Sequence, residues 1–401
     1  MPDIRNLALG PWRAVPVLGV TQILAWGALF YPPVLTVPLI AAERGWSITF
    51  AMGGFSAGLF AGGLIAPAVG SMIDRFGGHA VMTLGSLGGA AGLVAIVYAA
   101  HPVAYFATWI VLGAAMAASL YDPAFATLGR IFGAAARRPI TLLTFAGGFA
   151  STVSWPTTHL LIDAVGWRGA YLVYAALLAF VAAPLHAFAL PRVRAQAQVH
   201  ADAKGAASAA TLPPRGLPFI LVAAALAAYA FIPSGLSAHL LAIFGRAGID
   251  SSTVVFIGAL FGPSQVTARL AEFVFAGNAH PLNIARAAIV LVLAAFAILA
   301  FAGVSTPTAA AFAVMFGVTN GLITIARGTV PLALFGAAGY GRMVGRIAGP
   351  SLVMQSAAPL VLAFVAERAS DLAALGLTAA FALVALAGLA LVRRPDKEIS
   401  N

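Results

Sequence analysis

One arginine lies inside a long apolar stretch of the sequence, with two other polar side chains at helical spacing. In the stretch over 252–276, Gln265, Arg269 and Glu272 stand at i, i+4 and i+7, so on an α-helix they share one face. The planar fork of arginine suits a carboxylate or phosphate. The pattern predicts an anion site anchored by Arg269, with Glu272 tuning it or carrying a proton. The alternative is that Arg269 and Glu272 neutralise one another and hold helices together.

Three further ionisable side chains lie within apolar stretches, and each has a functional and a structural interpretation. Asp122, followed by Pro123, is a candidate proton carrier; the alternatives are a permanent ion pair or a hydrogen bond to backbone freed by the proline. His239 is a candidate proton relay, because histidine titrates near neutral pH, or a helix–helix hydrogen-bond donor. Arg327 is a candidate gating residue that approaches Asp122; the alternative is an arginine that extends towards water or links helices.

Polar and aromatic side chains in other apolar stretches are candidates to line a substrate pocket. Gln22 and Trp26 are four residues apart and share a helix face, and Tyr31 follows before two prolines. Asn320 and Gln355 are candidates of the same kind. A mostly apolar pocket with a few orienting polar atoms is typical of small-molecule sites. Simple packing is the alternative for Trp26.

The composition indicates that these residues are held by helices in a membrane. Of 401 residues, 61% are hydrophobic and 8% are charged, against roughly 25% charged residues in soluble domains, and the mean hydropathy is +0.98. Only helices and closed barrels satisfy their backbone groups in lipid. The apolar stretches run for about 20 residues or more, the length of a spanning helix, without the alternation of a barrel strand. The predicted class is an all-α membrane protein.

Twelve transmembrane helices are predicted in two bundles of six. Their ranges are 12–40, 49–73, 80–100, 104–132, 140–163, 168–190, 217–245, 252–276, 282–303, 306–328, 340–366 and 370–392. The long polar break over 191–217 predicts a flexible linker between an N-terminal bundle, 1–190, and a C-terminal bundle, 218–401.

The two halves resemble repeats of one another. A shift of 203 positions places 132–135 on 335–338, both of which read Phe-Gly-Ala-Ala, and Gly45 on Gly248. The same shift places Pro156 on Pro359. Repeats of this kind are typical of transporters, whose substrate site lies near the middle of the membrane where the repeats meet.

The basic residues predict the orientation. One set of alternating loops and termini holds sixteen of the 22 Lys and Arg residues, and the other loops hold only Arg44, Arg168, Arg246 and Arg368. Arg269 and Arg327 lie inside spans. Basic residues collect in cytoplasmic loops, so we expect a multi-pass protein of the bacterial inner membrane with both termini in the cytoplasm. The net charge of +10 therefore reflects topology and does not indicate a nucleic-acid partner.

The loop after the second predicted span, 70–79, carries a motif of four residues: Gly70, Asp74, Arg75 and Gly77. A glycine followed four and five positions later by Asp-Arg, and then by glycine, resembles the signature motif of the major facilitator superfamily. The family ends the motif with two basic residues, whereas this chain has glycine and histidine. The alternative is an ordinary charged turn flanked by glycines.

The resemblance covers effectively the whole chain, and the Gly-Trp-Arg sequence over 166–168 at the start of the sixth span is a second common feature of the family. It implies two six-helix bundles that transport a substrate by alternating access. In the family the motif latches neighbouring helices on the cytoplasmic side while the carrier faces outward. The resemblance therefore implies a gating role for the four motif residues.

An arginine within the eighth span is similar to the monocarboxylate porters and oxalate–formate exchangers, which use one there to hold the substrate carboxylate. The match falls on Arg269. The second basic residue that oxalate exchangers carry in the eleventh span is missing, because 352–364 contains no Lys or Arg. The resemblance therefore implies a monoanion or a mixed polar substrate rather than a dianion.

The leading hypothesis is a secondary transporter of a small organic anion, coupled to protons or to a counter-substrate. No Walker loop that would bind ATP is present. An exporter of drugs or metabolites with the same fold is the alternative, although 145–151 lacks the Gly-Pro pair of exporter branches. An enzyme is disfavoured, because neither His-Glu-x-x-His nor Gly-x-Ser-x-Gly occurs. With no cysteine and seven scattered histidines, no catalytic residue, metal or cofactor is predicted.

Overall fold

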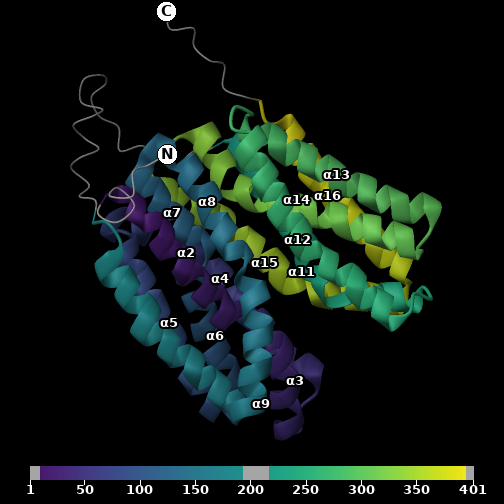
Figure 1. Cartoon of the computed structure of the whole chain (residues 1–401), viewed down its shortest axis with the longest axis horizontal. Helices are drawn as coiled ribbons and strands as arrows, with labels where there is room; N and C mark the ends of the chain where they lie inside the picture. Colours follow the sequence, from purple (N-terminus) through teal and green to yellow (C-terminus); the bar gives the residue numbers. More distant parts are fainter. Residues whose placement is uncertain (1–9, 193–215, 394–401) are drawn as a thin grey trace, which may run out of the picture. The chain divides into compact units, whose positions relative to one another are not determined.

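The computed structural model describes residues 10–192 and 216–393, and every regular element in these ranges is helical (Figure 1). The elements of the first range are η1 (Pro11–Arg13), α2 (Ala14–Ala25), η2 (Trp26–Phe30), α3 (Pro33–Arg44), α4 (Ile48–Phe76), α5 (Gly78–Tyr98), α6 (Pro102–Ser119), α7 (Tyr121–Phe132), η3 (Gly133–Ala136), α8 (Arg137–Gly148), α9 (Ala150–Leu177), η4 (Leu178–Ala182) and η5 (Leu185–Ala189). Those of the second are α11 (Leu217–Arg246), α12 (Ser251–Phe275), α13 (Pro281–Ala302), α14 (Thr306–Phe335), α15 (Tyr340–Arg368) and α16 (Asp371–Leu391). The predicted all-α class is confirmed.

Ten helical stretches of the described chain are long and apolar enough to cross a membrane. Nine of them have 21 to 34 residues, and the tenth, Pro102–Ala189, has 88. One straight helix of that length would extend about 130 Å, whereas the hydrocarbon core is about 30 Å thick. The backbone leaves the helical region at Gly133 and Gly166, with φ of 56° and 72°. The long stretch therefore makes three crossings, and the described chain makes the predicted twelve.

The chain forms two compact units. Unit 1 comprises the residues up to Pro213 together with Ala337–Ser356, and unit 2 comprises Pro214–Gly336 together with the residues from Ala357 onward. Helix α15 therefore begins in unit 1 and ends in unit 2. Most of the predicted linker, 191–217, lies outside the described residues, and the predicted division into 1–190 and 218–401 stays a prediction.

Helices of the two halves end at positions 203 residues apart. Helix α7 ends before Gly133 and α14 ends before Gly336, and these glycines have φ of 56° and 79°. Gly45, after α3, and Gly248, after α11, also have positive φ, 68° and 94°. Glycine adopts this conformation without the steric cost of a Cβ. The repeated glycines thus account for the matching helix ends.

Small residues bring helix backbones of unit 1 into contact. Helix α4 packs against α6, where a Cβ at Gly62 would lie 2.8 Å from the carbonyl oxygen of Gly113. Helix α4 also lies against the first turns of α15, where a Cβ at Gly63 would lie 2.8 Å from the oxygen of Gly349. Such close approach is typical of membrane helices packed through glycine, and it brings the motif at the end of α4 beside α15.

Unit 2 is packed in the same manner around α14. Helix α14 packs against α12 and α13, and α11 packs against α16. A Cβ at Gly321 would lie 2.6 Å from the carbonyl oxygen of Gln265, so the absence of a side chain there lets α14 approach α12 closely. This approach brings the polar residues of α12 beside Asn320.

Candidate functional site

Unit 2 contains a chain of hydrogen-bonded side chains that joins three helices. On α12, Arg269 Nη2 donates to Gln265 Oε1 at 3.2 Å. Asn320 Nδ2 on α14 donates to the same oxygen at 3.0 Å, and the hydroxyl of Tyr229 on α11 donates to Asn320 Oδ1 at 3.3 Å. Arg269 is only 3% exposed. The structure thus brings together three of the predicted substrate-binding residues, Gln265, Arg269 and Asn320.

Arg269 determines the direction of every hydrogen bond in this series of side chains. A guanidinium has donors only, so the atom of Gln265 that faces Arg269 is the amide oxygen. An oxygen only accepts, so Asn320 turns its nitrogen to Gln265 and its own oxygen to Tyr229. Both amide oxygens are therefore occupied. Among residues 10–192 and 216–393, none accepts a hydrogen bond from Gln265 Nε2, and the Gln265 side chain is half-buried.

Tyr229 is a member of this chain that the sequence analysis missed. A signal was present in the repeat, because the shift of 203 residues places Trp26 on Tyr229. Both residues are aromatic hydrogen-bond donors in the first span of their half. Applying the shift to each candidate residue would have identified it.

The remaining polar candidates outside the first span occupy different positions. Glu272 is buried on α12, three residues after Arg269. His239 on α11 bonds through Nε2 to the carbonyl oxygen of Pro359 at 2.9 Å. Since a carbonyl only accepts, Nε2 carries the hydrogen, and His239 makes a helix–helix hydrogen bond. Gln355 is half-buried on the part of α15 that belongs to unit 1, whereas Arg269 belongs to unit 2.

Gln22 is a buried bridge in unit 1. Its side chain is 0% exposed, and its Nε2 donates to the carbonyl oxygens of Ser119 at 2.8 Å and Leu120 at 3.3 Å. Its Oε1 accepts a hydrogen bond from Trp26 Nε1 at 3.0 Å. Leu120 is extended, with ψ of −155°, and separates α6 from α7. Pro123, four residues after Ser119, has no N–H, so the Ser119 carbonyl needs a partner outside its own helix. Gln22 supplies that partner.

Aromatic side chains surround a π-helical turn in the first span. The turn is η2, Trp26–Phe30, and turns of this type are frequent at functional sites. The ring of Trp26 lies 5.9 Å from that of Tyr31 and 5.1 Å from that of Tyr121. Tyr31 in turn contacts Trp155 of α9 edge to face, at 6.2 Å. The structure thus groups the predicted residues Trp26 and Tyr31 and adds Tyr121 and Trp155 to them.

Asp122 lies in the first turn of α7 and lines a small cavity in unit 1. Helices α4, α6 and α15 form the rest of the wall, with Gly70 and Gly341 among the lining residues. Arg327 lies on α14, in unit 2. The predicted approach of Arg327 to Asp122 stays a prediction.

The motif at the end of α4 contacts the start of α15 within unit 1. Asp74 Oδ1 accepts a hydrogen bond from the backbone nitrogen of Gly341 at 2.9 Å, and Asp74 Oδ2 accepts one from the backbone nitrogen of Arg342 at 2.7 Å. The first N–H groups of a helix have no partner in the helix and carry a partial positive charge, so a carboxylate is favourable there. Gly77 ends α4 with φ of 86°. Arg75 lies over the ring of Phe76, 4.9 Å from its centre.

Arg130 of α7 contacts the last turn of α4, the helix that carries the motif. Its Nη1 donates to the carbonyl oxygen of Ile73 at 3.3 Å and to that of Asp74. The last carbonyl groups of a helix carry a partial negative charge. A cation from another helix therefore supports the end of α4 in this chain.

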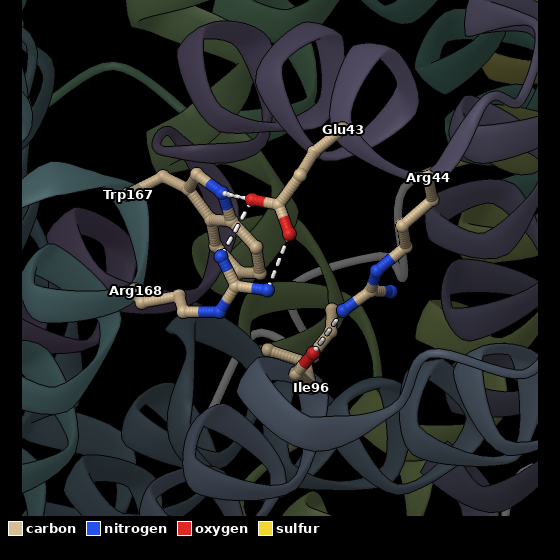
Figure 2. Close-up of polar contacts among 5 residues, drawn as sticks. All are labelled: Glu43, Arg44, Ile96, Trp167 and Arg168. Atoms are coloured by element: carbon tan, nitrogen blue, oxygen red, sulfur yellow. Dashed lines mark hydrogen bonds and ion pairs between the residues drawn. The ribbon is translucent and has the colours of Figure 1, made fainter.

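At the other end of unit 1, one carboxylate joins two helices (Figure 2). Arg168 donates to both oxygens of Glu43, through Nη1 to Oε2 at 2.5 Å and through Nη2 to Oε1, and Trp167 Nε1 donates to Oε2 at 2.9 Å. Arg44 turns towards a different partner, the carbonyl oxygen of Ile96, at 2.8 Å. We call this end of unit 1, with Glu43 and Arg168, the arginine-poor end, and the end with Asp74 and Arg130 the arginine-rich end.

Unit 2 has an ion pair at the equivalent positions with the charges exchanged. Arg246 Nε and Nη2 donate to the two carboxylate oxygens of Asp371, at 2.8 and 2.7 Å. The shift of 203 residues places Glu43 on Arg246 and Arg168 on Asp371. In both units the pair joins the end of the first span to the start of the sixth.

Comparisons with known proteins place the chain in a family. The model of the Major Facilitator Superfamily matches residues 18–347. No curated protein matches the chain. The human organic anion transporter MFSD10 (TETRAN) has a similar structure, with a TM-score of 0.72, 17% identity, and coverage of 97% of this chain and 100% of that one.

Two further solved structures show the same fold. The proton:xylose symporter XylE, bound to 6-bromo-6-deoxy-D-glucose, has a TM-score of 0.70, 12% identity, and coverage of 96% of this chain and 97% of that one. FucP in the outward conformation has a TM-score of 0.68, 14% identity, and coverage of 95% and 99%. At such identities these likenesses concern the fold alone, whereas the family match covers most of the sequence. The chain therefore belongs to the major facilitator superfamily of multi-pass membrane transporters.

Proposed function

We propose that the chain is a secondary active transporter that moves a small organic anion, a carboxylate, across the bacterial inner membrane by alternating access. Transport is coupled to protons or to a counter-substrate. Arg269 is the anion anchor. The excess of Lys and Arg in one set of loops supports an orientation with both termini in the cytoplasm.

The observation that carries the proposal is the buried arginine and the polarity of its surroundings. A charged side chain within a span costs at least about 2.5–3.5 kcal/mol on insertion scales, so it is a functional candidate by default. The amide oxygens of Gln265 and Asn320 are occupied by donors. The Gln265 amide therefore offers N–H groups beside a guanidinium, a combination that favours a ligand rich in acceptors.

A carboxylate has acceptors only, and it pairs with the guanidinium fork through parallel hydrogen bonds. One of the structures with the same fold is an organic anion transporter, which supports this substrate class. A neutral sugar would need acceptors for its hydroxyl groups, and the Gln265–Asn320 chain uses its own amide oxygens internally.

In unit 1 we assign Trp26 and Tyr31 to the substrate path and Gln22 to positioning Trp26. The hydrogen bond from Trp26 to the buried amide of Gln22 supports this division of roles. We infer that the contact of Asp74 with the first turn of α15 stabilises one state of the transport cycle and is broken in another.

Proteoliposome uptake of radiolabelled mono- and dicarboxylates, with an imposed pH gradient, tests the proposal. Arg269→Ala should reduce uptake of the transported anion about 100-fold, because the loss of charge-assisted hydrogen bonds worth about 3 kcal/mol corresponds to that factor. Arg269→Lys should recover part of it, because lysine keeps the charge without the planar fork.

Arg368→Ala is the matched control, since Arg368 is an exposed arginine of unit 2 stacked over Phe364. It should transport like the wild type. Unchanged anion uptake in both Arg269 variants would exclude Arg269 as the anchor. A preference of the wild type for neutral or cationic compounds would favour the exporter alternative.

A further inference from the structure

The second half of the fifth span, residues 150–165 of α9, presents three different faces. Ser154 and Thr158 face the interior, where Ser154 donates to the carbonyl oxygen of Gly27 at 3.0 Å. The other two faces are exposed. One is apolar and includes Leu160, 68% exposed, and the other carries His159 and Asp163, whose side chains are 70% and 63% exposed.

Trp155, His159 and Asp163 stand at i, i+4 and i+8, so they form one stripe along the helix. Val153 and Leu160, seven residues apart, form another, about 100° around the axis. We call the first the polar stripe. A carboxylate facing hydrocarbon costs about 2.5–3.5 kcal/mol even on the lowest scales, and such groups face the bundle interior or a water-filled cavity. The apolar stripe therefore suits lipid, and the polar stripe requires water.

The polar stripe begins at the arginine-poor end of unit 1 and leads to the aromatic group of the candidate site. Asp163 lies three residues before Gly166, where the span ends. At the other end of the stripe, Trp155 contacts Tyr31 at 6.2 Å, and Tyr31 contacts Trp26 at 5.9 Å. The stripe thus connects a membrane surface to the π-helical turn of the first span.

We propose that His159 and Asp163 form a proton-binding pair on a water-lined path and, resting on the function proposed above, that this pair takes up the proton that accompanies the anion. His159 Nδ1 lies 2.9 Å from Asp163 Oδ2. A carboxylate only accepts, so Nδ1 carries the hydrogen of the neutral ring. A proton from water then binds to Nε2, which among the described residues has no hydrogen-bond partner. The carboxylate stabilises the resulting imidazolium, and release of the proton reverses the step.

The charged groups on the helices packed against α9 are bonded to residues other than His159 or lie at the arginine-rich end of unit 1. At the arginine-poor end, Glu43 of α3 is bonded to Arg168, and Arg44 of α3 is bonded to the Ile96 carbonyl. The other titratable groups on these helices are Tyr98 of α5 and, at the arginine-rich end, His79 of α5 with Arg137 and Arg138 of α8. The carboxylate facing His159 is therefore that of Asp163.

Cysteine labelling tests the water-lined path without a known substrate, because the natural chain has no cysteine. His159→Cys and Asp163→Cys are compared with Val153→Cys and Leu160→Cys, the matched controls on the apolar stripe. A membrane-impermeant maleimide is added to intact cells and to inverted vesicles. The polar-stripe variants should react at least about tenfold faster in one of the two preparations, since thiols need water to ionise and react. Equal rates on the two stripes would overturn the proposal.

Proton binding is measured by the tryptophan fluorescence of the purified protein between about pH 5 and 8, where histidine titrates. Trp155 lies one helical turn before His159, and an imidazolium quenches a neighbouring indole. The wild type should show a quenching step that His159→Gln lacks. Asp163→Asn should alter the step, because the Asp163 carboxylate is the hydrogen-bond partner of His159 Nδ1. His101→Gln, an exposed histidine at the same end of unit 1, should keep the step. An unchanged step in His159→Gln would refute proton binding there.

Transport separates this inference from the proposed function. With a transported carboxylate, His159→Gln should lose accumulation driven by a pH gradient at least about tenfold, yet keep exchange at equal pH within about twofold, because exchange needs no net proton movement. Arg269→Ala should lose both. Normal accumulation by His159→Gln, or loss of exchange along with it, would overturn the coupling role. If the wild type transports no carboxylate, the proposed function and the coupling role fail together, while labelling and fluorescence still decide the proton-binding pair.

Discussion

Gln22 in unit 1 and Gln265 in unit 2 share one local arrangement. Each accepts a hydrogen bond through Oε1 from the side chain four residues later, Trp26 Nε1 in one case and Arg269 Nη2 in the other. They differ at the nitrogen. Gln22 Nε2 is bonded to two backbone carbonyl groups of another span, whereas no described residue accepts from Gln265 Nε2. The Gln22 amide nitrogen is bonded within unit 1, whereas the Gln265 amide nitrogen has no acceptor among the described residues, which is why we propose that it binds the substrate.

The cause of the difference lies in the neighbouring helix. At the break between α6 and α7, the Ser119 carbonyl lacks a donor within its own helix and faces Gln22. The neighbour of Gln265 is Asn320, which donates to Oε1 and leaves Nε2 unused. For a glutamine with a donor at i+4, the groups that the next helix presents thus decide whether its amide nitrogen is bonded within the fold.

Leucine substitutions of Gln22 and Gln265 test this comparison, and we expect them to have the largest effect on the unfolding temperature. Gln22→Leu removes the partner of the buried Ser119 carbonyl and that of the Trp26 indole N–H, at about 1–3 kcal/mol each. We expect it to lower the unfolding temperature of the purified protein by about 5–10 °C. Gln265→Leu should lower it by no more than about 2 °C, because its side chain is half-buried, and should raise the KM for the anion at least about fivefold. Thermal unfolding and initial uptake rates measure the two effects, and equal loss of stability in both variants would contradict the assignment.

The two ion pairs provide a second comparison, with a smaller effect. Exposed pairs contribute about 0.2–1 kcal/mol, so Glu43→Arg and Arg246→Asp should each lower the unfolding temperature by about 1–4 °C. Adding Asp371→Arg to Arg246→Asp should restore it, since the pair is only reversed. Adding Arg168→Glu to Glu43→Arg should restore it in part, because Glu43 also accepts a hydrogen bond from Trp167. Full recovery in unit 1 would mean that the tryptophan contact adds nothing.

The N-terminal caps of α4 and α12 provide a third comparison between the units, with the smallest expected effect on stability. Ser47 caps α4, and Asp250, its equivalent under the repeat, caps α12; each accepts a hydrogen bond from the backbone nitrogen three residues later, at 3.1 and 3.0 Å. Hydrogen bonds from Ser252 and Thr253 hold the pKa of the Asp250 carboxyl well below its usual range. A lowered pKa in the folded state means stabilisation above the unfolded value of about 3.9, lost as the pH falls through the folded value.

Asp250→Ser should therefore make the unfolding temperature slightly less dependent on pH under acidic conditions, and Ser47→Asp should make it slightly more dependent. The unfolding temperature at pH 7 and at about pH 3, compared between each variant and the wild type, measures this. The difference between the two pH values should shrink in Asp250→Ser and grow in Ser47→Asp. A larger acid sensitivity in Asp250→Ser would contradict the assigned sign.

The sequence by itself determined the fold class and the twelve spans. Each span must satisfy its backbone groups within one helix, so its signal is a local run of apolar residues. Gly133 and Gly336 end helices 203 residues apart, because glycine adopts positive φ without the steric cost of a Cβ. The i, i+4 spacing also put Gln265 and Arg269 on one face, as it does on any helix.

Only the tertiary structure decided which side chains of other helices these helix faces contact. Tyr229 joins the site through Asn320, 91 residues away, and no local pattern contains such a pair. His159 and Asp163 lie near the end of a span. The burial of Ser154 shows which face of α9 packs inside unit 1, and the exposure of Leu160 shows which exposed face is apolar, so the polar stripe is distinguished from both. A hydrogen bond between helices depends on which helix packs alongside, and that depends on the packing of all the helices in the unit rather than on any one of them.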